Sequence, residues 1–193
     1  SMLLLTGRHN ITLDTIASVR LTGLSAKDTA NMLRFEGETR NIPTLQYADK
    51  QTLQTIWEAT EGAPLALKLI AGQMAEEIPL DEILVILRAA SSHEADYDFY
   101  RFIYQRSWVA LDQASRKLLT TMAFYPPRVG GLRNDIMLTS TLDSSTFRNS
   151  AKLLHKMSLL ELHNNGDMKL LALHTLTFNF IESDILNLPW ARG

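Results

Sequence analysis

The sequence predicts a mainly α-helical protein, in which a helical subdomain precedes a domain of helices with one β-hairpin. From residue 25 onward most segments repeat apolar residues every three or four positions, which is typical of amphipathic helices. Two apolar segments, SLLELH and MKLLAL, flank the turn signal NNGD and predict a hairpin. A short apolar strand at Met2–Leu5 precedes all of these elements.

Composition limits the class of protein. The 193 residues suffice for one good core or two small ones. A net charge of −2 gives no global electrostatic reason to expect nucleic acid or an anionic membrane as a partner. No apolar run approaches the roughly 20 residues of a membrane helix. The absence of cysteine excludes disulfides and thiol chemistry. We therefore expect a cytoplasmic protein with no membrane partner.

The N-terminal strands need a partner. Met2–Leu5 and a second candidate within residues 17–24 are short and apolar, as in a parallel sheet covered on both faces. Two strands do not make such a sheet alone. We expect its remaining strands to precede this sequence in a longer parent chain.

The helical subdomain is expected over residues 25–95. Ser25 and Asp28 form a capping-box pattern that predicts a helix start. Pro64 suits the first position of a helix because its missing N–H costs nothing there. The other expected elements are a loop at 36–43, helices at 48–62 and 64–77, and a helix at 81–90 capped by Asp81.

The second domain is expected over residues 96–186, after an N-terminal segment of residues 1–24 and before a tail of residues 187–193. Asp112 and Asp143 are the predicted caps of two of its helices. The expected elements are helices at 96–111, 112–125, near 132–138 and at 143–157, the hairpin, and a helix at 174–185. Three helices followed by a hairpin is the order of a winged-helix domain.

Catalytic motifs are missing from the sequence. It contains no GxxxxGK[ST] phosphate loop, no HExxH, no CxxC and no GxSxG. The histidines at positions 9, 93, 155, 163 and 174 lack metal-ligand spacing. We therefore expect no metal site and no independent enzyme activity.

Separated segments together resemble the NB-ARC family of STAND-class signal-transducing P-loop ATPases. LLLTGR resembles the first sensor motif, and VRLTGLSAKDTANML resembles the segment after it. EGAPLALKLIAG resembles the Gly-x-Pro motif that begins the family's small helical domain. ALDQASRKLLTTMAFYP and LLHKMSLLELHNNGDMKLLALHTLTFNFI resemble its winged-helix domain.

This resemblance implies an ADP/ATP-dependent regulatory switch in signal transduction. The chain would supply its sensor strand, helical domain and winged helix. The phosphate loop and Walker B strand would lie upstream, where the parent would also bind Mg²⁺. The implied partners are nucleotide, the upstream P-loop domain, and protein partners or self-association on activation. Binding of nucleotide by this portion alone is expected to be weak or absent.

The resemblance also implies site residues. Arg8 would approach the γ-phosphate, for which a guanidinium offers two hydrogen bonds, and Thr6 would be positional. Gly62 would let the backbone approach a ligand, and the Pro64 ring would cover one face of adenine. The alternative is a C-cap glycine followed by a first-position proline.

His174 would hold the ADP β-phosphate by the same resemblance. The alternative is a histidine satisfied within the fold. Thr175 stands where the family has aspartate, which puts the family's tight ADP-bound state in question.

Two other functions stay open at this point. Arg148, Lys152 and Lys156 are spaced four apart on the helix that a DNA-binding winged helix inserts into the major groove, with Phe147, Ala151 and Leu154 facing the core. The chain would then be a transcriptional regulator. The third reading is a helical protein-interaction module whose nucleotide motifs have decayed.

Overall fold

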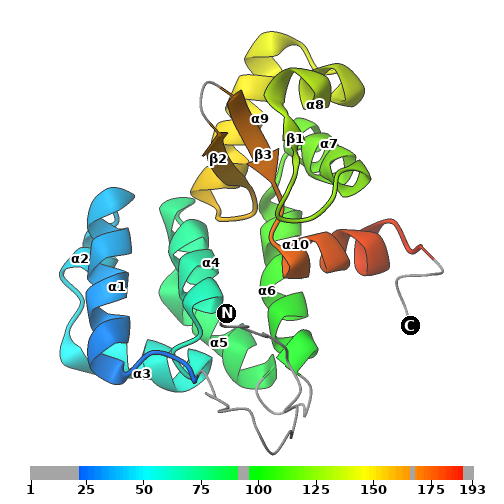
Figure 1. Cartoon of the computed structure of the whole chain (residues 1–193). Coiled ribbons are helices and arrows are strands. Elements are labelled where there is room, and N and C mark those ends of the chain that lie inside the picture. Colours follow the sequence, from blue (N-terminus) through cyan, green and yellow to red (C-terminus); the bar gives the residue numbers. More distant parts are fainter. Residues whose placement is uncertain (1–21, 91–95, 166–167, 189–193) are drawn as a thin grey trace, which may run out of the picture.

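The computed structural model describes residues 22–90, 96–165 and 168–188, and these residues fold into a mainly helical protein with a small three-stranded antiparallel sheet (Figure 1). The mainly α prediction is confirmed. The expected strand at Met2–Leu5 lies outside the described residues. Among the residues described, no helix is both long and apolar enough to cross a bilayer.

The first part of the chain is a set of packed helices. Ser25 caps the first of them, since its hydroxyl accepts from the backbone N–H of Asp28 at 3.1 Å. The same hydroxyl donates to the Asp28 carboxylate at 2.7 Å, so the carboxylate closes the box through the side chain. The helices are α1 (Ala26–Thr39), α2 (Pro43–Gln46), α3 (Lys50–Thr60), α4 (Pro64–Ala75), α5 (Leu80–Ala90) and α6 (Asp96–Ala110).

Two local predictions in this part were wrong. Residues 36–43 were expected to form a loop, but α1 continues to Thr39 and α2 begins at Pro43. Glu36 sustains the helix there because its carboxylate pairs with Arg40, one turn later, at 2.6 Å. Asp81 was expected to cap α5, yet the helix begins at Leu80 and Asp81 lies in its first turn. A carboxylate is favourable there too, since it faces the positive end of the helix dipole.

The second part begins with α7 (Gln113–Thr121), capped by Asp112 as predicted. A 3₁₀ turn, η1, covers Met122–Phe124. The following elements are β1 (Gly131–Leu132), α8 (Arg133–Ser140), α9 (Ser144–Lys156), β2 (Glu161–Asn165), β3 (Met168–Ala172), α10 (Thr175–Phe180) and a π-helical segment, η2 (Ile181–Ile185).

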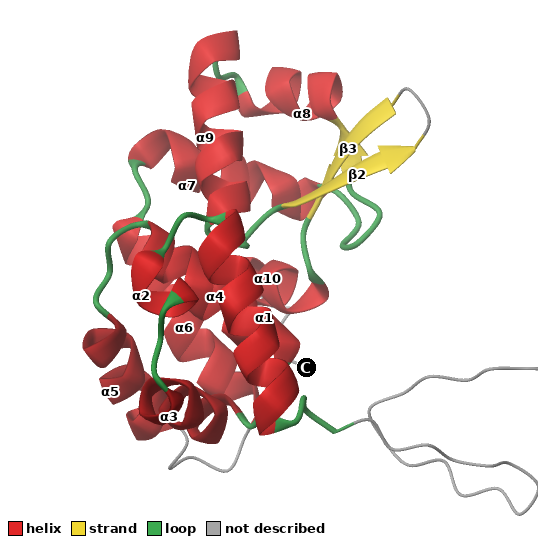
Figure 2. Ribbon diagram, turned by 90° about the vertical axis from the view of Figure 1, so that its left-hand side faces the viewer, coloured by secondary structure: helices red, strands yellow, loops and turns green. Residues whose placement is uncertain are grey.

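The sheet has the order β1-β3-β2, with both pairs antiparallel. β2 and β3 form the predicted hairpin, in which Leu162 faces Leu171. β1 was not expected from the sequence and is a strand of two residues, with Gly131 opposite Leu171. Figure 2 shows this sheet at one end of the molecule, beside α8 and α9.

One apolar core runs through both parts of the chain. Phe147 and Leu154 of α9 are fully buried, as predicted, and Ala151 packs at the edge of the core. Helix α6 packs on α10, because its Tyr104 ring stacks on Phe180 with centroids 5.4 Å apart. Gln73 of α4 also donates to the carbonyl of Ile103 on α6 at 2.9 Å.

The described residues form two parts, which we call the head and the body. The head comprises residues 112–173, from the cap of α7 to the end of the sheet. The body comprises the described residues of 22–110 together with residues 174–188, which include α10. The chain therefore passes between body and head at two places, once after α6 and once before α10 (Figure 1).

Candidate functional site

Gly62 makes a contact within the protein. Glu61 and Gly62 both adopt left-handed backbone conformations, with φ of 49° and 70°. The N–H of Leu24 donates to the Gly62 carbonyl at 2.9 Å, and a Cβ on Gly62 would lie 2.2 Å from the carbonyl oxygen of Leu24. A Cβ on Gly23 would lie only 1.8 Å from the carbonyl oxygen of Glu61. The two glycines therefore allow the chain entering α1 to cross the turn between α3 and α4.

The indole of Trp57 holds this crossing in place. Its Nε1–H donates to the carbonyl of Leu24 at 2.9 Å. Leu24 is thus bound through its N–H to the turn and through its carbonyl to α3. Gly62 is buried beneath this contact, so it serves the packing of the chain on itself.

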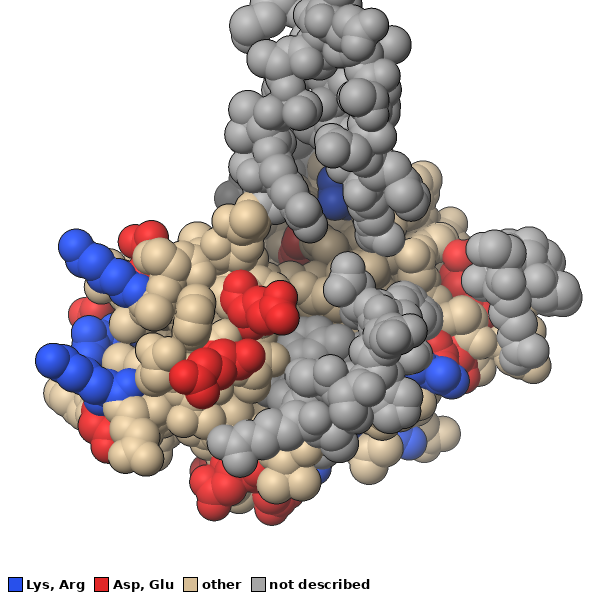
Figure 3. Space-filling model, turned by 90° about the horizontal axis from the view of Figure 1, so that it is seen from below, with Lys and Arg blue, Asp and Glu red and all other residues tan. Residues whose placement is uncertain are grey.

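Pro64 lies at the first position of α4, as predicted, and it is exposed. The neighbouring end of α3 carries two exposed acids, Glu58 and Glu61. Figure 3 views the molecule from the end opposite the sheet, where the visible acidic and basic side chains are interspersed. Lys68, one turn further along α4, is exposed as well, so acidic and basic side chains both lie near Pro64 in the chain.

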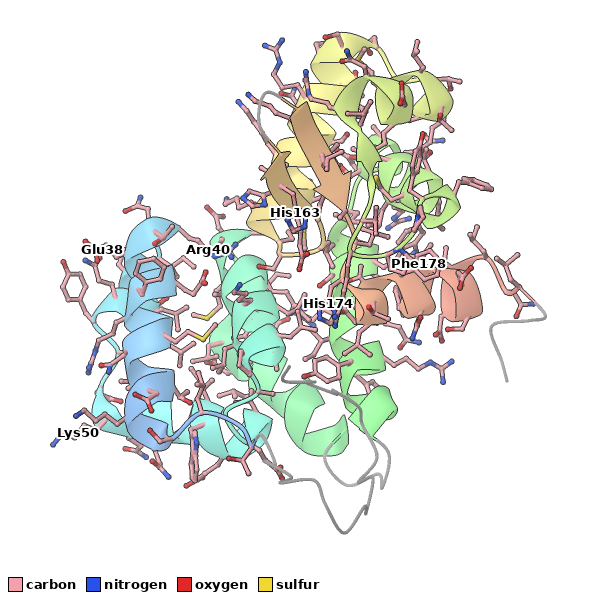
Figure 4. The ribbon with its side chains drawn as sticks, viewed as in Figure 1. Glu38, Arg40, Lys50, His163, His174 and Phe178 are labelled. Carbon is pink, nitrogen blue, oxygen red and sulfur yellow. The ribbon has the colours of Figure 1, made fainter. Side chains whose placement is uncertain are left out.

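His174 caps α10. Its ring Nδ1 accepts from the backbone N–H of Leu176 at 3.2 Å. A neutral imidazole that accepts at Nδ1 carries its proton on Nε2. The side chain is half-buried and lies where β3 passes into α10, alongside α6 (Figure 4). The histidine therefore caps the helix through Nδ1.

Pro64 and His174 lie on different helices at different levels of the body. Pro64 begins α4, whereas the α10 segment begun by His174 packs on α6 through Thr177, whose hydroxyl donates to that of Tyr104 at 3.0 Å. Gln73, which joins α4 to the same region of α6, is nine residues beyond Pro64, or about 14 Å along the helix at 1.5 Å per residue. A single ligand that touches both residues must be elongated.

The basic stripe of α9 is only partly available. Arg148 and Lys152 are exposed. Lys156 instead reaches α4, where its ammonium bonds the Ala75 carbonyl and the Glu76 carboxylate, each at 2.7 Å. The third cation of the stripe is therefore held by the body.

A polar junction that the sequence did not reveal surrounds the same turn. Besides its bond to Glu36, the Arg40 guanidinium donates to the Ser158 hydroxyl at 2.8 Å and to the Lys156 carbonyl. Ser158 in turn donates to the Lys68 carbonyl at 3.1 Å. The only sequence signal was the Glu36–Arg40 spacing of four residues, which does not indicate the distant partners.

Other predicted residues have no structural outcome. Arg8 and Thr6 lie outside the described residues. Within residues 22–90, 96–165 and 168–188, no three His, Asp or Glu side chains are grouped so as to hold a metal ion. No protein-family model matches this chain, and no curated protein matches it significantly.

Proposed function

We propose that this chain is the sensor, helical and winged-helix portion of a cytoplasmic NB-ARC-like switch that responds to ADP and ATP. The observation that carries the proposal is the element order of the head. Its order, α7, β1, α8, α9, β2, β3 with the sheet β1-β3-β2, supports the proposal of a winged helix. It follows a helical unit in which an exposed proline begins a helix two residues after a left-handed glycine.

The proposed nucleotide contacts are Pro64 for the base and His174 for the β-phosphate, with Arg8 at the γ-phosphate. The exposed Pro64 ring is a rigid apolar surface suited to one face of a nucleobase. An imidazole N–H can donate to a phosphate oxygen, and the family resemblance implies this contact for His174. ADP would act by binding one arrangement of the domains better than the other, since equal affinity for both shifts nothing.

A DNA-binding regulator is the weaker candidate. The head carries eight Lys and Arg against five Asp and Glu, which is a modest positive surplus. Against this, Lys156 is exposed but already forms an ion pair with Glu76 of the body. A clear basic footprint is expected of a nucleic-acid-binding face.

The test uses the longest natural chain that contains these residues. Purified protein is saturated with MgADP, desalted and denatured, and the nucleotide released is quantified. We expect stoichiometric ADP, and a sharp loss in both Pro64→Ala and His174→Ala. Sequencing upstream of residue 1 should reveal a GxxxxGK[ST] motif.

The matched control is Pro43→Ala, which alters the other exposed proline that begins a helix in the body. It should leave ADP retention unchanged. Absence of adenine nucleotide from the wild-type chain at millimolar MgADP would overturn the proposal. Salt-dependent binding of duplex DNA that is lost in Arg148→Glu/Lys152→Glu would instead favour the regulator.

A further inference from the structure

The junction around Arg40 lies between parts of the protein that are far apart in sequence. Arg40 follows α1, Ser158 follows α9, and Lys68 belongs to α4. Ser158 has a φ of 59°, so the chain after α9 makes a left-handed turn against the body. Figure 4 shows Arg40 beside α4 and below the sheet.

Two groups of polar contacts hold this turn, one on each side. On the first side Arg40 bonds the Lys156 carbonyl and the Ser158 hydroxyl. On the other side the Lys156 ammonium binds the last turn of α4 through the Ala75 carbonyl and Glu76. A cation is favourable there because the end of a helix exposes unpaired carbonyls and the negative end of its dipole.

Gly72 provides the close approach between these two groups. It lies within α4, where glycine is less favourable than alanine by about 1 kcal/mol. A Cβ at this position would lie 2.6 Å from the carbonyl carbon and oxygen of Met157. Those atoms are backbone and cannot rotate away. The absence of a side chain at Gly72 therefore allows the turn between α9 and β2 to pack directly on α4.

We propose that Arg40, Lys156 and Ser158 form a polar clamp that holds the head on the body and that can open while both remain folded. The residues between Ala110 and Gln113 and between Ala172 and Thr175 then act as the two hinges. The apolar core is shared by head and body, so the opening motion also separates apolar contacts between them. The clamp depends on no nucleotide, so it stands apart from the function proposed above.

The clamp is weakened by salt, because the ammonium of Lys156 and the carboxylate of Glu76 are 46% and 30% exposed and partly screened. Its opening separates β2 from α1. The exposed residues Glu38 on α1 and His163 on β2 lie on opposite sides of the clamp (Figure 4). The distance between these two residues therefore indicates whether the clamp is closed or open.

The test measures the distance between these two positions. The chain has no native cysteine, so Glu38→Cys/His163→Cys places two spin labels for pulsed electron resonance. We expect one narrow distance distribution in the otherwise wild-type chain at low salt. Lys156→Met/Ser158→Gly removes the ammonium contacts with α4 and the hydroxyl contacts of Ser158, and it leaves Arg40 paired with Glu36. It should shift the mean to a longer distance and broaden the distribution.

Gly72→Ala is the second variant. It removes no polar group and favours the helix, but its methyl group forces the turn away from α4. We expect the same shift to longer distance as in the first variant. It keeps the test decisive if the first variant fails to fold, as far-UV circular dichroism would show.

The matched control is Arg106→Gln, which removes an ion pair with Glu82 inside the body. It should retain the wild-type distribution. A wild-type distribution in Gly72→Ala and in the folded clamp variant, at both low and high salt, would overturn the proposal.

Discussion

The neighbours of Gly62 in the structure define its role. The sequence allows either a ligand-facing glycine or a C-cap, and the structure adds a third role as the seat for the chain at Leu24. This role makes the residue intolerant of a side chain, because its φ is left-handed and an added Cβ would lie 2.2 Å from the carbonyl oxygen of Leu24. Any nucleotide role at this turn therefore falls to the exposed Pro64.

Gly62→Ala tests this role at the level of one residue. We expect the free energy of unfolding to fall by about 1–3 kcal/mol, since strain and displacement of Leu24 add. Urea denaturation followed by tryptophan fluorescence measures the change. Glu61→Gly, at the adjacent left-handed position, should change stability by less than about 1 kcal/mol. Equal stability of Gly62→Ala and wild type would show that the crossing does not constrain this turn.

The helix caps act at the scale of the element. Asp143 receives hydrogen bonds from the hydroxyls of Ser145 and Thr146, at 2.6 Å and 2.5 Å, and from the backbone N–H of Thr146 at 3.0 Å. These bonds stabilise the carboxylate and hold the pKa of Asp143 well below its ordinary value of 3.8. Asp49 caps α3 in the same way, with its pKa lowered chiefly by the backbone N–H of Thr52.

The pH dependence follows from the sign of this shift. A carboxyl with a lower pKa in the folded state stabilises the protein above its unfolded pKa, and the stabilisation is lost as pH falls through the folded pKa. We expect Asp143→Asn to reduce the loss of stability below about pH 4, measured by urea unfolding across that range. Asn can still cap α9, so the helix is kept. If the free energy of unfolding falls equally at low pH in Asp143→Asn and in wild type, Asp143 does not contribute to the acid sensitivity.

The charge distribution and the apolar core extend over the whole molecule. The head has a positive surplus while the chain as a whole is −2, so the remainder is acidic and the two attract. Their shared apolar core and the polar clamp are therefore supported by long-range electrostatics that salt weakens.

Catalysis is also a matter for the whole chain. We expect the 193 residues alone to release no phosphate from MgATP above the rate of buffer, because the sequence lacks the glycine-rich loop and lysine that hold the phosphates. A coupled phosphate assay with enzyme at micromolar concentration measures this. Phosphate release that co-purifies with the protein and persists through gel filtration would contradict it.

Several elements follow from local interactions that the sequence pattern reveals. The caps Ser25, Asp112 and Asp143, the helix start at Pro64 and the β2–β3 hairpin follow from neighbouring residues, and the structure confirms them. Their hydrogen bonds join residues a few positions apart, so the pattern of the sequence suffices to predict them.

Contacts between residues that are far apart in the sequence were found only in the folded structure. The contacts of Gly62 with Leu24, of Gly72 with Met157 and of Arg40 with Ser158 join residues 38 to 118 positions apart. Neither periodicity nor propensity encodes such partners, because each depends on how whole helices pack. For the same reason, Lys156 belongs to a solvated basic stripe in sequence and to the seam between head and body in space.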